Sequence, residues 1–294
     1  MSSTDSQNRP SPPFPEQATG PLPGQENKMD PAPEFEGENY LPAGKLKDKV
    51  AIITGGDSGI GRSVAVLFAR EGAKVTFSYL PEEKQDAEET RQAIESVGGE
   101  SLAVALDVTD YASCENLVSA CIEKFGQVDI LINNAAFQNH VPETESLSFE
   151  QWDKTFQTNI YGYFRMVKAT LPKLKAGSTI INTGSITGLE GSSGLLDYSS
   201  TKGAIHAFTK TLAQELVKKK IRVNCVAPGP VWTPLNPAER TEDEVKHFGE
   251  GTPYGRPAQP DEIAPTYVYL ASNADSGYLT GQVIALLGGA TRAG

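Results

Sequence analysis

Seven short runs of mainly apolar residues follow one another along the chain, each bounded by turn-forming residues. Unbroken apolar runs of this length indicate strands that are covered on both faces, whereas strict alternation indicates a strand with one face in water. The predicted strands are 50–53, 75–78, 102–106, 130–132, 179–182, 222–226 and 283–286.

Stretches with helical spacing separate these strands. The predicted helices are 60–71, 82–97, 111–125, 150–171, 198–219 and 261–271. Strands that alternate with helices indicate a parallel sheet joined by right-handed crossovers. We therefore predict an α/β fold for residues 46–294, a single doubly wound, Rossmann-type parallel sheet with helices on both faces.

Residues 1–45 differ in kind from the rest. They contain 9 of the 20 prolines, and the first 44 residues carry seven acidic side chains against two basic ones. Such a segment cannot bury enough apolar surface to offset the entropy lost on ordering. We predict a proline-rich, acidic N-terminal arm that is disordered over 1–28. For the later part of the arm, the alternative to disorder is an extended segment that docks on a partner subunit through Met29, Phe35, Tyr40 and Leu41.

Composition limits the partners and the compartment. The formal net charge is −11, so the basic footprint that nucleic acids and anionic membranes require is missing. No run reaches the roughly 20 apolar residues of a membrane span, and residues 1–45 contain no apolar signal-peptide core. Three cysteines are too few for a disulfide scaffold. We expect a cytoplasmic protein that binds a small molecule, with no nucleic-acid or membrane partner.

A glycine-rich stretch, Thr54–Gly61 (TGGDSGIG), joins the first predicted strand to the first predicted helix. Glycines let the backbone approach a pyrophosphate, and the free N–H groups at a helix start favour an anion. The spacing is T-G-x-x-x-G-x-G rather than G-x-G-x-x-G, and a purely structural turn is the alternative. The stretch predicts dinucleotide contacts at Gly55, Asp57, Ser58, Gly59, Ile60 and Gly61.

The end of the second predicted strand bears on the choice between NAD and NADP. A carboxylate there would bind the adenosine ribose and repel a 2′-phosphate, and an arginine would attract the phosphate. Tyr79 and Leu80, which we predict to contact the cofactor, offer neither. Lys84 follows, but Glu82 and Glu83 stand beside it. The choice stays open, and the missing carboxylate slightly favours NADP.

Polar and turn-forming residues follow three more strands. The carboxyl ends of parallel strands are where open α/β sheets bind ligands, although an ordinary turn is an equal alternative at each position taken singly. After the sixth strand, a rigid turn suits the nicotinamide amide and the start of a mobile lid. The predicted contacts are Asp107, Val108, Asn134, Ala135, Pro228, Gly229, Val231 and Thr233.

Tyr198 and Lys202 are four residues apart at the start of a predicted helix, so both side chains lie on one face. A free tyrosine titrates near about 10, and a neighbouring ammonium lowers that pKa. The pair suits acid–base chemistry at a hydroxyl or carbonyl, but a surface pair of this spacing is common by chance. Ser185, just beyond the fifth strand, is placed to bind the reacting oxygen. Asn159, in the helix before that strand, is placed to order a water chain to Lys202.

Taken together, these motifs resemble those of the short-chain dehydrogenase/reductase family. TGGDSGIG, Asp107, NNAA (133–136), Asn159, Ser185, YSSTK (198–202) and PGPVWTP (228–234) occur in the family's order over 46–294. The regions around Met29–Pro31 and Lys45–Leu46 resemble the glucose/ribitol dehydrogenase-like and bacterial general-stress oxidoreductase branch. Two departures are small: Ala136 stands where relatives often have glycine, and Gly184 where many have serine.

The resemblance implies roles for the matching residues. Tyr198 is then the proton donor or acceptor, Lys202 its pKa modifier and a ribose ligand, Ser185 the group that polarises the substrate oxygen, and Asn159 the holder of a proton-relay water. Hydride passes between the nicotinamide and the substrate carbon without a metal, and the protein is a homotetramer. The Y-x-x-x-K spacing argues against the enoyl-reductase branch.

Two functions follow from these observations. The first is an NAD(P)-dependent oxidoreductase that interconverts an alcohol or sugar/polyol hydroxyl and the corresponding aldehyde or ketone. The alternative is a stress-associated nucleotide-binding or scaffold protein with little turnover, whose arm binds a partner. The sequence favours the enzyme, because a sensor has no need of Ser185 and Tyr198 together. His140, His206 and His247 are scattered without metal-ligand spacing, so no metal site is predicted.

Overall fold

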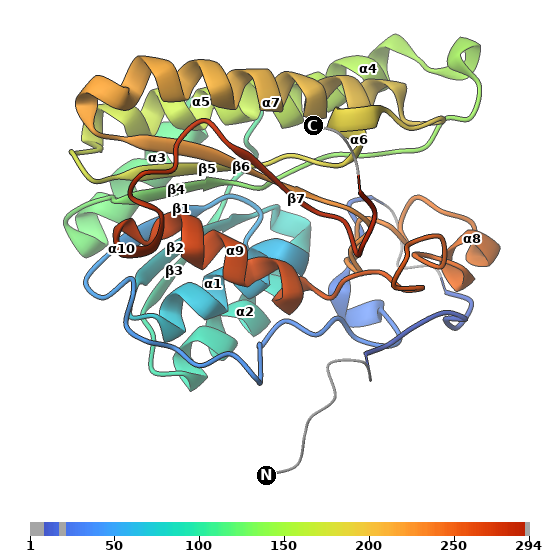
Figure 1. Ribbon diagram of the computed structural model, residues 1–294, viewed down its shortest axis with the longest axis horizontal. Coiled ribbons are helices and arrows are strands. Elements are labelled where there is room, and N and C mark those ends of the chain that lie inside the picture. Colours follow the sequence, from blue (N-terminus) through green and yellow to red (C-terminus); the bar gives the residue numbers. More distant parts are fainter. Residues whose placement is uncertain (1–8, 18–21, 292–294) are drawn as a thin grey trace.

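The computed structural model describes residues 9–17 and 22–291. Within them, seven parallel strands form one sheet in the order β3-β2-β1-β4-β5-β6-β7 (Figure 1). This order reverses between β1 and β4, which is where an open α/β sheet leaves a crevice at the carboxyl ends of its strands. The strands are β1 (Val50–Ile53), β2 (Lys74–Tyr79), β3 (Ser101–Ala105), β4 (Ile130–Asn133), β5 (Thr179–Thr183), β6 (Arg222–Pro228) and β7 (Val283–Leu286). The predicted α/β fold is confirmed.

Helices cover both faces of the sheet (Figure 1). One apolar core joins it to α1 (Gly59–Arg70), α2 (Lys84–Ser96) and α9 (Pro260–Ala271). A second core joins the other face to α3 (Tyr111–Phe125), α5 (Gly162–Thr170) and α7 (Leu196–Leu216). Because both faces are covered, the central strands carry apolar side chains on either side, as their unbroken apolar runs predict.

The predicted helix 150–171 is divided in the structure. It consists of α4 (Phe149–Phe156), a π-helical turn at Gln157–Tyr161, and α5. Single π turns inside helices occur frequently at functional sites, and this one carries Asn159. Three short helices were not predicted, because four or five residues give no periodicity to recognise: α6 (Thr187–Glu190), α8 (Glu242–Lys246) and α10 (Asn273–Ser276).

The N-terminal arm lies along its own chain, which differs from the disorder predicted over 1–28. Phe14 is buried and stacks on Trp232 with ring centroids 4.1 Å apart. Met29 joins the same apolar cluster, and Arg9 forms an ion pair with Asp261 at 3.0 Å. A few well-placed anchors therefore order a segment whose average composition indicates disorder. Residues 1–8 and 18–21, which belong to the same prediction, lie outside the described residues.

The residues predicted to dock on a partner subunit mostly contact the same chain. Phe35 and Tyr40 pack against the core that contains α1, whereas Leu41 is 87% exposed. In the part of the chain that the structure describes, no helix has the length and apolarity needed to cross a membrane.

Candidate active site

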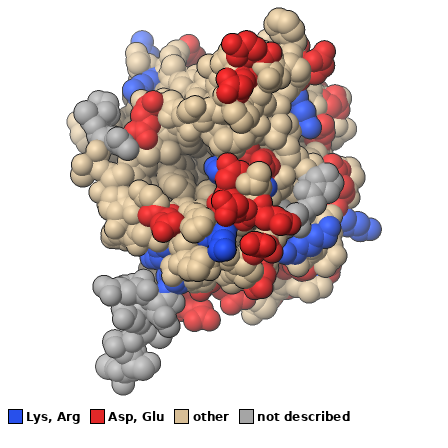
Figure 2. All heavy atoms as spheres, turned by 90° about the vertical axis from the view of Figure 1, so that its right-hand side faces the viewer, with Lys and Arg blue, Asp and Glu red and all other residues tan. Residues whose placement is uncertain are grey.

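A cavity of about 1070 Å³ opens at the carboxyl ends of the strands. Figure 2 shows the hollow on this face of the molecule, with acidic side chains more widespread around it than basic ones. Most of the residues predicted from the sequence line this cavity: Gly55, Asp57, Ser58, Gly59, Ile60, Tyr79, Leu80, Asp107, Val108, Asn134, Ala135, Ser185, Tyr198, Lys202, Pro228, Gly229, Val231 and Thr233. Gly61 and Asn159 lie behind that lining.

The glycine turn is held tightly against the end of β4. Asn134 Nδ2 donates to the backbone oxygen of Gly55 at 2.9 Å, and Thr54 Oγ1 accepts from the backbone N–H of Asn134 at 2.9 Å. A Cβ on Gly61 would lie 1.9 Å from that same Gly55 oxygen, so only glycine fits there. The turn thus brings the start of α1 close to the cavity, as a dinucleotide cradle requires.

The N-terminal arm caps the helix that starts at this turn. Ser58 occupies the N-cap position of α1 but makes no side-chain capping bond. Instead, Glu26 accepts a hydrogen bond from the backbone N–H of Gly59 and pairs with Arg62 at 2.7 Å. Burial raises the pKa of Glu26 to about 7, and the Arg62 charge opposes that rise. Sequence reasoning missed this residue, and it also missed Leu22 and Pro23, which line the cavity.

Carboxylates stand at the end of the cavity next to β2. Asp57, Glu82 and Glu83 line it, whereas Lys84 does not appear in the lining. Burial raises the pKa of both Asp57 and Glu83 above their ordinary values. Arg62 lies nearby, but its guanidinium is engaged by Glu26 and by the backbone oxygen of Asp86 at 3.0 Å.

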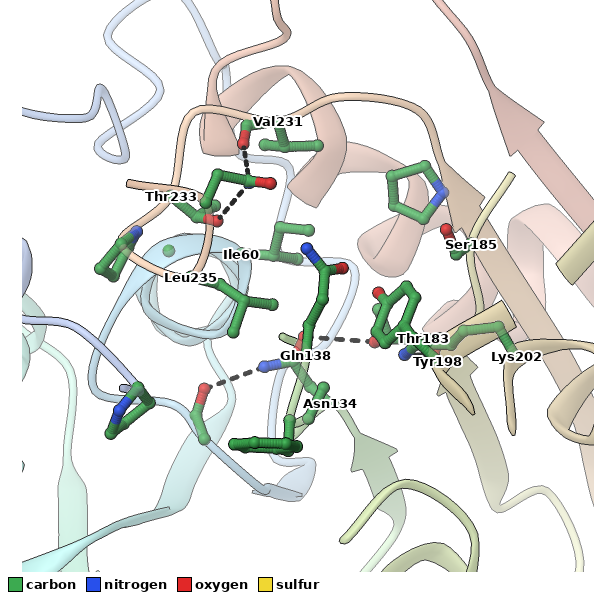
Figure 3. Close-up of a pocket in the computed structure, with 18 of the residues that line it drawn as sticks. Ile60, Asn134, Gln138, Thr183, Ser185, Tyr198, Lys202, Val231, Thr233 and Leu235 are labelled. Atoms are coloured by element: carbon green, nitrogen blue, oxygen red, sulfur yellow. Dashed lines mark hydrogen bonds between the residues drawn. The ribbon is translucent and has the colours of Figure 1, made fainter. Parts of the chain in front are cut away.

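Tyr198 and Lys202 lie side by side in the cavity wall, on the first turns of α7 (Figure 3). Lys202 Nζ lies 5.3 Å from the centre of the Tyr198 ring and donates to the backbone oxygen of Thr183 at 2.8 Å. Burial lowers the pKa of Lys202 to about 8. Burial also raises the pKa of Tyr198, and a hydrogen bond with Ser185 opposes that rise. The rise differs from the lowering expected from the Lys202 ammonium, because burial has the largest effect on the Tyr198 pKa and disfavours the charged phenolate.

Ser185 follows β5 and lies near Tyr198 on the same side of the cavity (Figure 3). Its hydroxyl oxygen accepts from the backbone N–H and from the hydroxyl of Thr187, both at 3.1 Å. These two donors fix the Ser185 oxygen and leave its own proton available to a third group. The side chain is therefore positioned to donate to an oxygen atom held near Tyr198.

Asn159 uses its side chain differently from the prediction. Its Oδ1 accepts from the backbone N–H of Phe137 at 2.8 Å, and its Nδ2 donates to the Phe137 oxygen and to Thr201 Oγ1, each at 3.0 Å. The amide thus ties the loop after β4 to α7 and is occupied by these contacts.

The segment after β6 folds over the cavity. Val231 and Ala258 form an isolated bridge, and Asn236 Nδ2 donates to the Val231 oxygen at 2.9 Å (Figure 3). Trp232 is fully buried and donates through Nε1 to the Pro31 oxygen of the arm at 2.8 Å. We call residues 231–250 the lid segment; the arm packs on its outer side.

In the part of the chain that the structure describes, no group of three or more His, Cys, Asp or Glu side chains is arranged to hold a metal ion.

Comparison with known proteins identifies the family. A family profile described as "Enoyl-(Acyl carrier protein) reductase" matches residues 55–291. A "Glucose and ribitol dehydrogenase" of Daucus carota is 48% identical over 94% of this chain and 97% of its own length. "General stress protein 39" of Bacillus subtilis is 48% identical over 94% and 96%, and "NADPH-dependent aldehyde reductase 1, chloroplastic" of Arabidopsis thaliana 46% over 91% and 95%.

Solved structures give the same result. A "Short chain dehydrogenase from Burkholderia cenocepacia J2315 in complex with NADP" superposes with a TM-score of 0.77 at 27% identity, covering 83% of this chain and 98% of that one. An "NADH-dependent reductase A1-R' complexed with NAD" gives 0.73 at 32% identity over 84% and 98%. The chain belongs to the short-chain dehydrogenase/reductase family of NAD(P)-dependent oxidoreductases, which confirms the predicted resemblance and its branch.

Proposed function

We propose that the protein interconverts an alcohol or a sugar/polyol hydroxyl and the corresponding aldehyde or ketone, with Tyr198 as the acid–base group. The observation that carries the proposal is that Ser185, Tyr198 and Lys202 line one wall of the same cavity, with Lys202 Nζ 5.3 Å from the centre of the Tyr198 ring. The printed names of relatives, which include a glucose and ribitol dehydrogenase and an aldehyde reductase, support this substrate range.

The cavity fits a nicotinamide dinucleotide. The close approach of Gly61 to Gly55 and of Gly59 to Thr233, where added Cβ atoms would lie 1.9 and 2.9 Å from their neighbours, forms the narrow cradle that a pyrophosphate needs. Asp107 and Asn134 would hold the adenosine half and its linker, and Pro228–Thr233 the nicotinamide half. When bound, the dinucleotide accepts or supplies the hydride.

The chain's own residues then handle the proton. During oxidation, Tyr198 takes the proton of the substrate hydroxyl, and during reduction it returns a proton to the carbonyl oxygen. Ser185 donates to the same oxygen and stabilises the charge that develops there. Lys202 places a cation beside the phenol and favours its ionised form. Asn159 acts as a positioning residue, since it fixes the loop after β4 against α7.

Two observations bear in opposite directions on whether this chain prefers NAD or NADP. NADP retains the support of the aldehyde reductase relative, whose name gives NADPH dependence. Against it stands the β2 end of the cavity, which is lined by Asp57, Glu82 and Glu83 and not by Lys84, so these side chains supply no cation for a 2′-phosphate. Initial rates measured with each dinucleotide at matched concentrations decide the preference.

The proposal is tested by replacing Tyr198 with phenylalanine and assaying a panel of sugars, polyols and small aldehydes. We expect Tyr198→Phe to lose turnover by at least about a hundredfold and to keep its affinity for the dinucleotide. Wild-type kcat in this variant would contradict the assigned role. The scaffold alternative has less support, because Phe14 and Met29 of the arm are buried within the same chain.

We also propose a cytoplasmic homotetramer. Phe149 is 86% exposed, and Tyr161 and Phe164 of the adjoining π-helical turn and α5 are about half exposed, which suits a subunit contact on these helices. Cys114, Cys121 and Cys225 are free and buried, as expected in a reducing compartment. Light scattering of the wild type and of Phe164→Glu tests the assembly: the variant should have the smaller mass.

A further inference from the structure

Gln138 extends from the loop after β4 into the cavity. Figure 3 shows its side chain between Leu235 of the lid segment and Tyr198, with the amide at the level of the tyrosine ring. The residue is almost completely buried. An amide so placed is close to the reacting groups, and the proposed chemistry leaves it without a role.

The direction of this amide is fixed by Glu239 of the lid segment. Gln138 Nε2 donates to Glu239 Oε1, and His140 Nδ1 lies 2.7 Å from Glu239 Oε2. The Glu239 side chain is 0% exposed, so these neighbours replace water around it. Because this bond runs from Nε2 to a carboxyl oxygen, Gln138 turns its NH₂ group toward Glu239. Its Oε1 then faces the other way, toward Tyr198, as Figure 3 shows.

The loop that carries Gln138 is held on both sides of the residue. The backbone N–H of Phe137 donates to Asn159 Oδ1 at 2.8 Å. Asn139 and Gln151 exchange two hydrogen bonds, from Asn139 Nδ2 to Gln151 Oε1 at 2.8 Å and from Gln151 Nε2 to the Asn139 oxygen at 2.9 Å. A binding group supported in this way keeps its geometry without help from the ligand.

We propose that Gln138 Oε1, oriented by Glu239, accepts a hydrogen bond from a substrate hydroxyl close to the reacting carbon. The assignment rests on the proposed function and narrows it to hydroxylated substrates: 2-hydroxyaldehydes, aldoses and polyols. A substrate without that hydroxyl leaves a buried carbonyl oxygen without a donor, which costs binding free energy. Gln138 is thus a specificity-determining residue, and Glu239 is the positioning residue that holds it.

The test compares two aldehydes with the same three-carbon skeleton, glyceraldehyde and propanal, in the reductive direction. The quantity measured is the ratio of their kcat/KM values. Gln138→Leu should lower the ratio by about 10- to 100-fold through loss on glyceraldehyde, with kcat/KM for propanal and KM for the dinucleotide within about twofold of wild type. Gln138→Met provides a second variant of similar volume if the leucine variant folds poorly.

Glu239→Gln tests the positioning step. A neutral amide no longer dictates which end of Gln138 faces the cavity, so the ratio should fall severalfold. Glu242→Gln is the matched control, because Glu242 is an exposed acidic residue in the first turn of α8, within the lid segment but outside the cavity lining. Its ratio should remain that of the wild type, and melting temperatures should show that all variants are folded.

Three results would overturn the inference. One is an unchanged ratio in Gln138→Leu, another is an equal loss on both aldehydes, and the third is a rise in the KM for the dinucleotide, which would assign the amide to the cofactor. A normal ratio in Glu239→Gln together with a lowered ratio in Gln138→Leu would overturn the positioning role alone. A wild-type protein that reduces neither these aldehydes nor the wider panel would instead overturn the proposed function.

Discussion

Glu26 accepts a hydrogen bond from the backbone N–H of Gly59, so a carboxylate 33 residues upstream caps the helix that opens the cofactor cradle. The arm and the glycine turn are therefore one structural unit. Asp86 of α2 completes it by accepting from the backbone N–H groups of Glu26 and Asn27 at 3.1 and 3.3 Å.

Removing the cap should weaken both folding and cofactor binding. Glu26→Ala removes the acceptor of the Gly59 N–H and the 2.7 Å partner of the buried Arg62, so the free energy of unfolding should fall by about 2 kcal/mol. Urea denaturation measures this loss, and a fluorescence titration should show weaker dinucleotide binding. Glu26→Gln, which keeps an acceptor, should lose less, and the exposed Glu38→Gln should match the wild type. Equal stability of Glu26→Ala and Glu38→Gln would contradict the capping role.

Stability should fall as the pH rises through neutrality. Burial raises the pKa values of Glu26, Asp57 and Glu83 in the folded state, to about 7 for Glu26. Such groups stabilise the fold fully below their unfolded pKa values of about 4, and this contribution is lost as the pH rises through the folded values. The free energy of unfolding should therefore decrease between about pH 5 and pH 8.

Glu83→Gln removes one of these titrations and gives the control for that experiment. Urea midpoints recorded across the same pH range should decrease less steeply in the variant than in the wild type. Parallel curves for the two proteins would show that Glu83 does not contribute to the pH dependence.

The rate of alcohol oxidation should increase with pH well into the alkaline range. Tyr198 acts as a base only when ionised, and burial raises its pKa. Because the hydrogen bond from Ser185 favours the phenolate, Ser185→Ala should move the rising limb of the kcat/KM profile to higher pH and lower kcat by about a hundredfold. Profiles from pH 6 to pH 10.5 measure both effects. A rate loss without any movement of the limb would restrict Ser185 to binding the substrate oxygen.

Gly61 should not tolerate even one added carbon. In Gly61→Ala, the Cβ would lie 1.9 Å from the Gly55 oxygen and push the turn out of place. We expect dinucleotide affinity to fall by more than about tenfold, with a smaller change in melting temperature. Gly203→Ala in α7 is the matched control, because an added Cβ there would lie 3.6 Å from its nearest neighbour, the Gly188 oxygen of α6, and alanine is favoured over glycine inside a helix.

Phe14 should anchor the arm locally. Its ring stacks on Trp232, and its backbone N–H donates to the Lys246 oxygen at 2.9 Å. Phe14→Ala should free the arm before the remainder of the fold opens, so limited proteolysis should cut within residues 9–34 at least severalfold faster. The exposed Leu41→Ala should leave the cleavage rate unchanged. Equal cleavage of wild type and Phe14→Ala would show that other contacts hold the arm.

The sheet could be predicted from the sequence because its strands are buried on both faces and carry unbroken apolar runs, as at Val50–Ile53. The cavity lining could be predicted because the fold brings the carboxyl ends of strands together, which placed Asp107 and Asn134 on one edge. The departure at position 184 also has a physical reason: an added Cβ would lie 2.4 Å from His206 Nε2.

Long-range contacts could not be predicted in the same way. Nothing near Glu26 in the sequence indicates that it caps a helix starting at Gly59, and nothing near Glu239 indicates that it orients Gln138. The pKa of Tyr198 was missed for a related reason, since the sequence places the Lys202 charge beside it but does not give the depth of its burial.

Trp232 is one of only two tryptophans in the chain. It lies fully buried where the lid segment packs against the arm, and its ring centroid is 6.1 Å from that of Phe248. In a Trp152→Phe background, Trp232 becomes the sole indole fluorophore. A red shift in its emission then reports exposure of this indole ring to water. Stopped-flow emission after mixing with substrate then tests, with no dye attached, whether the lid segment moves over the cavity.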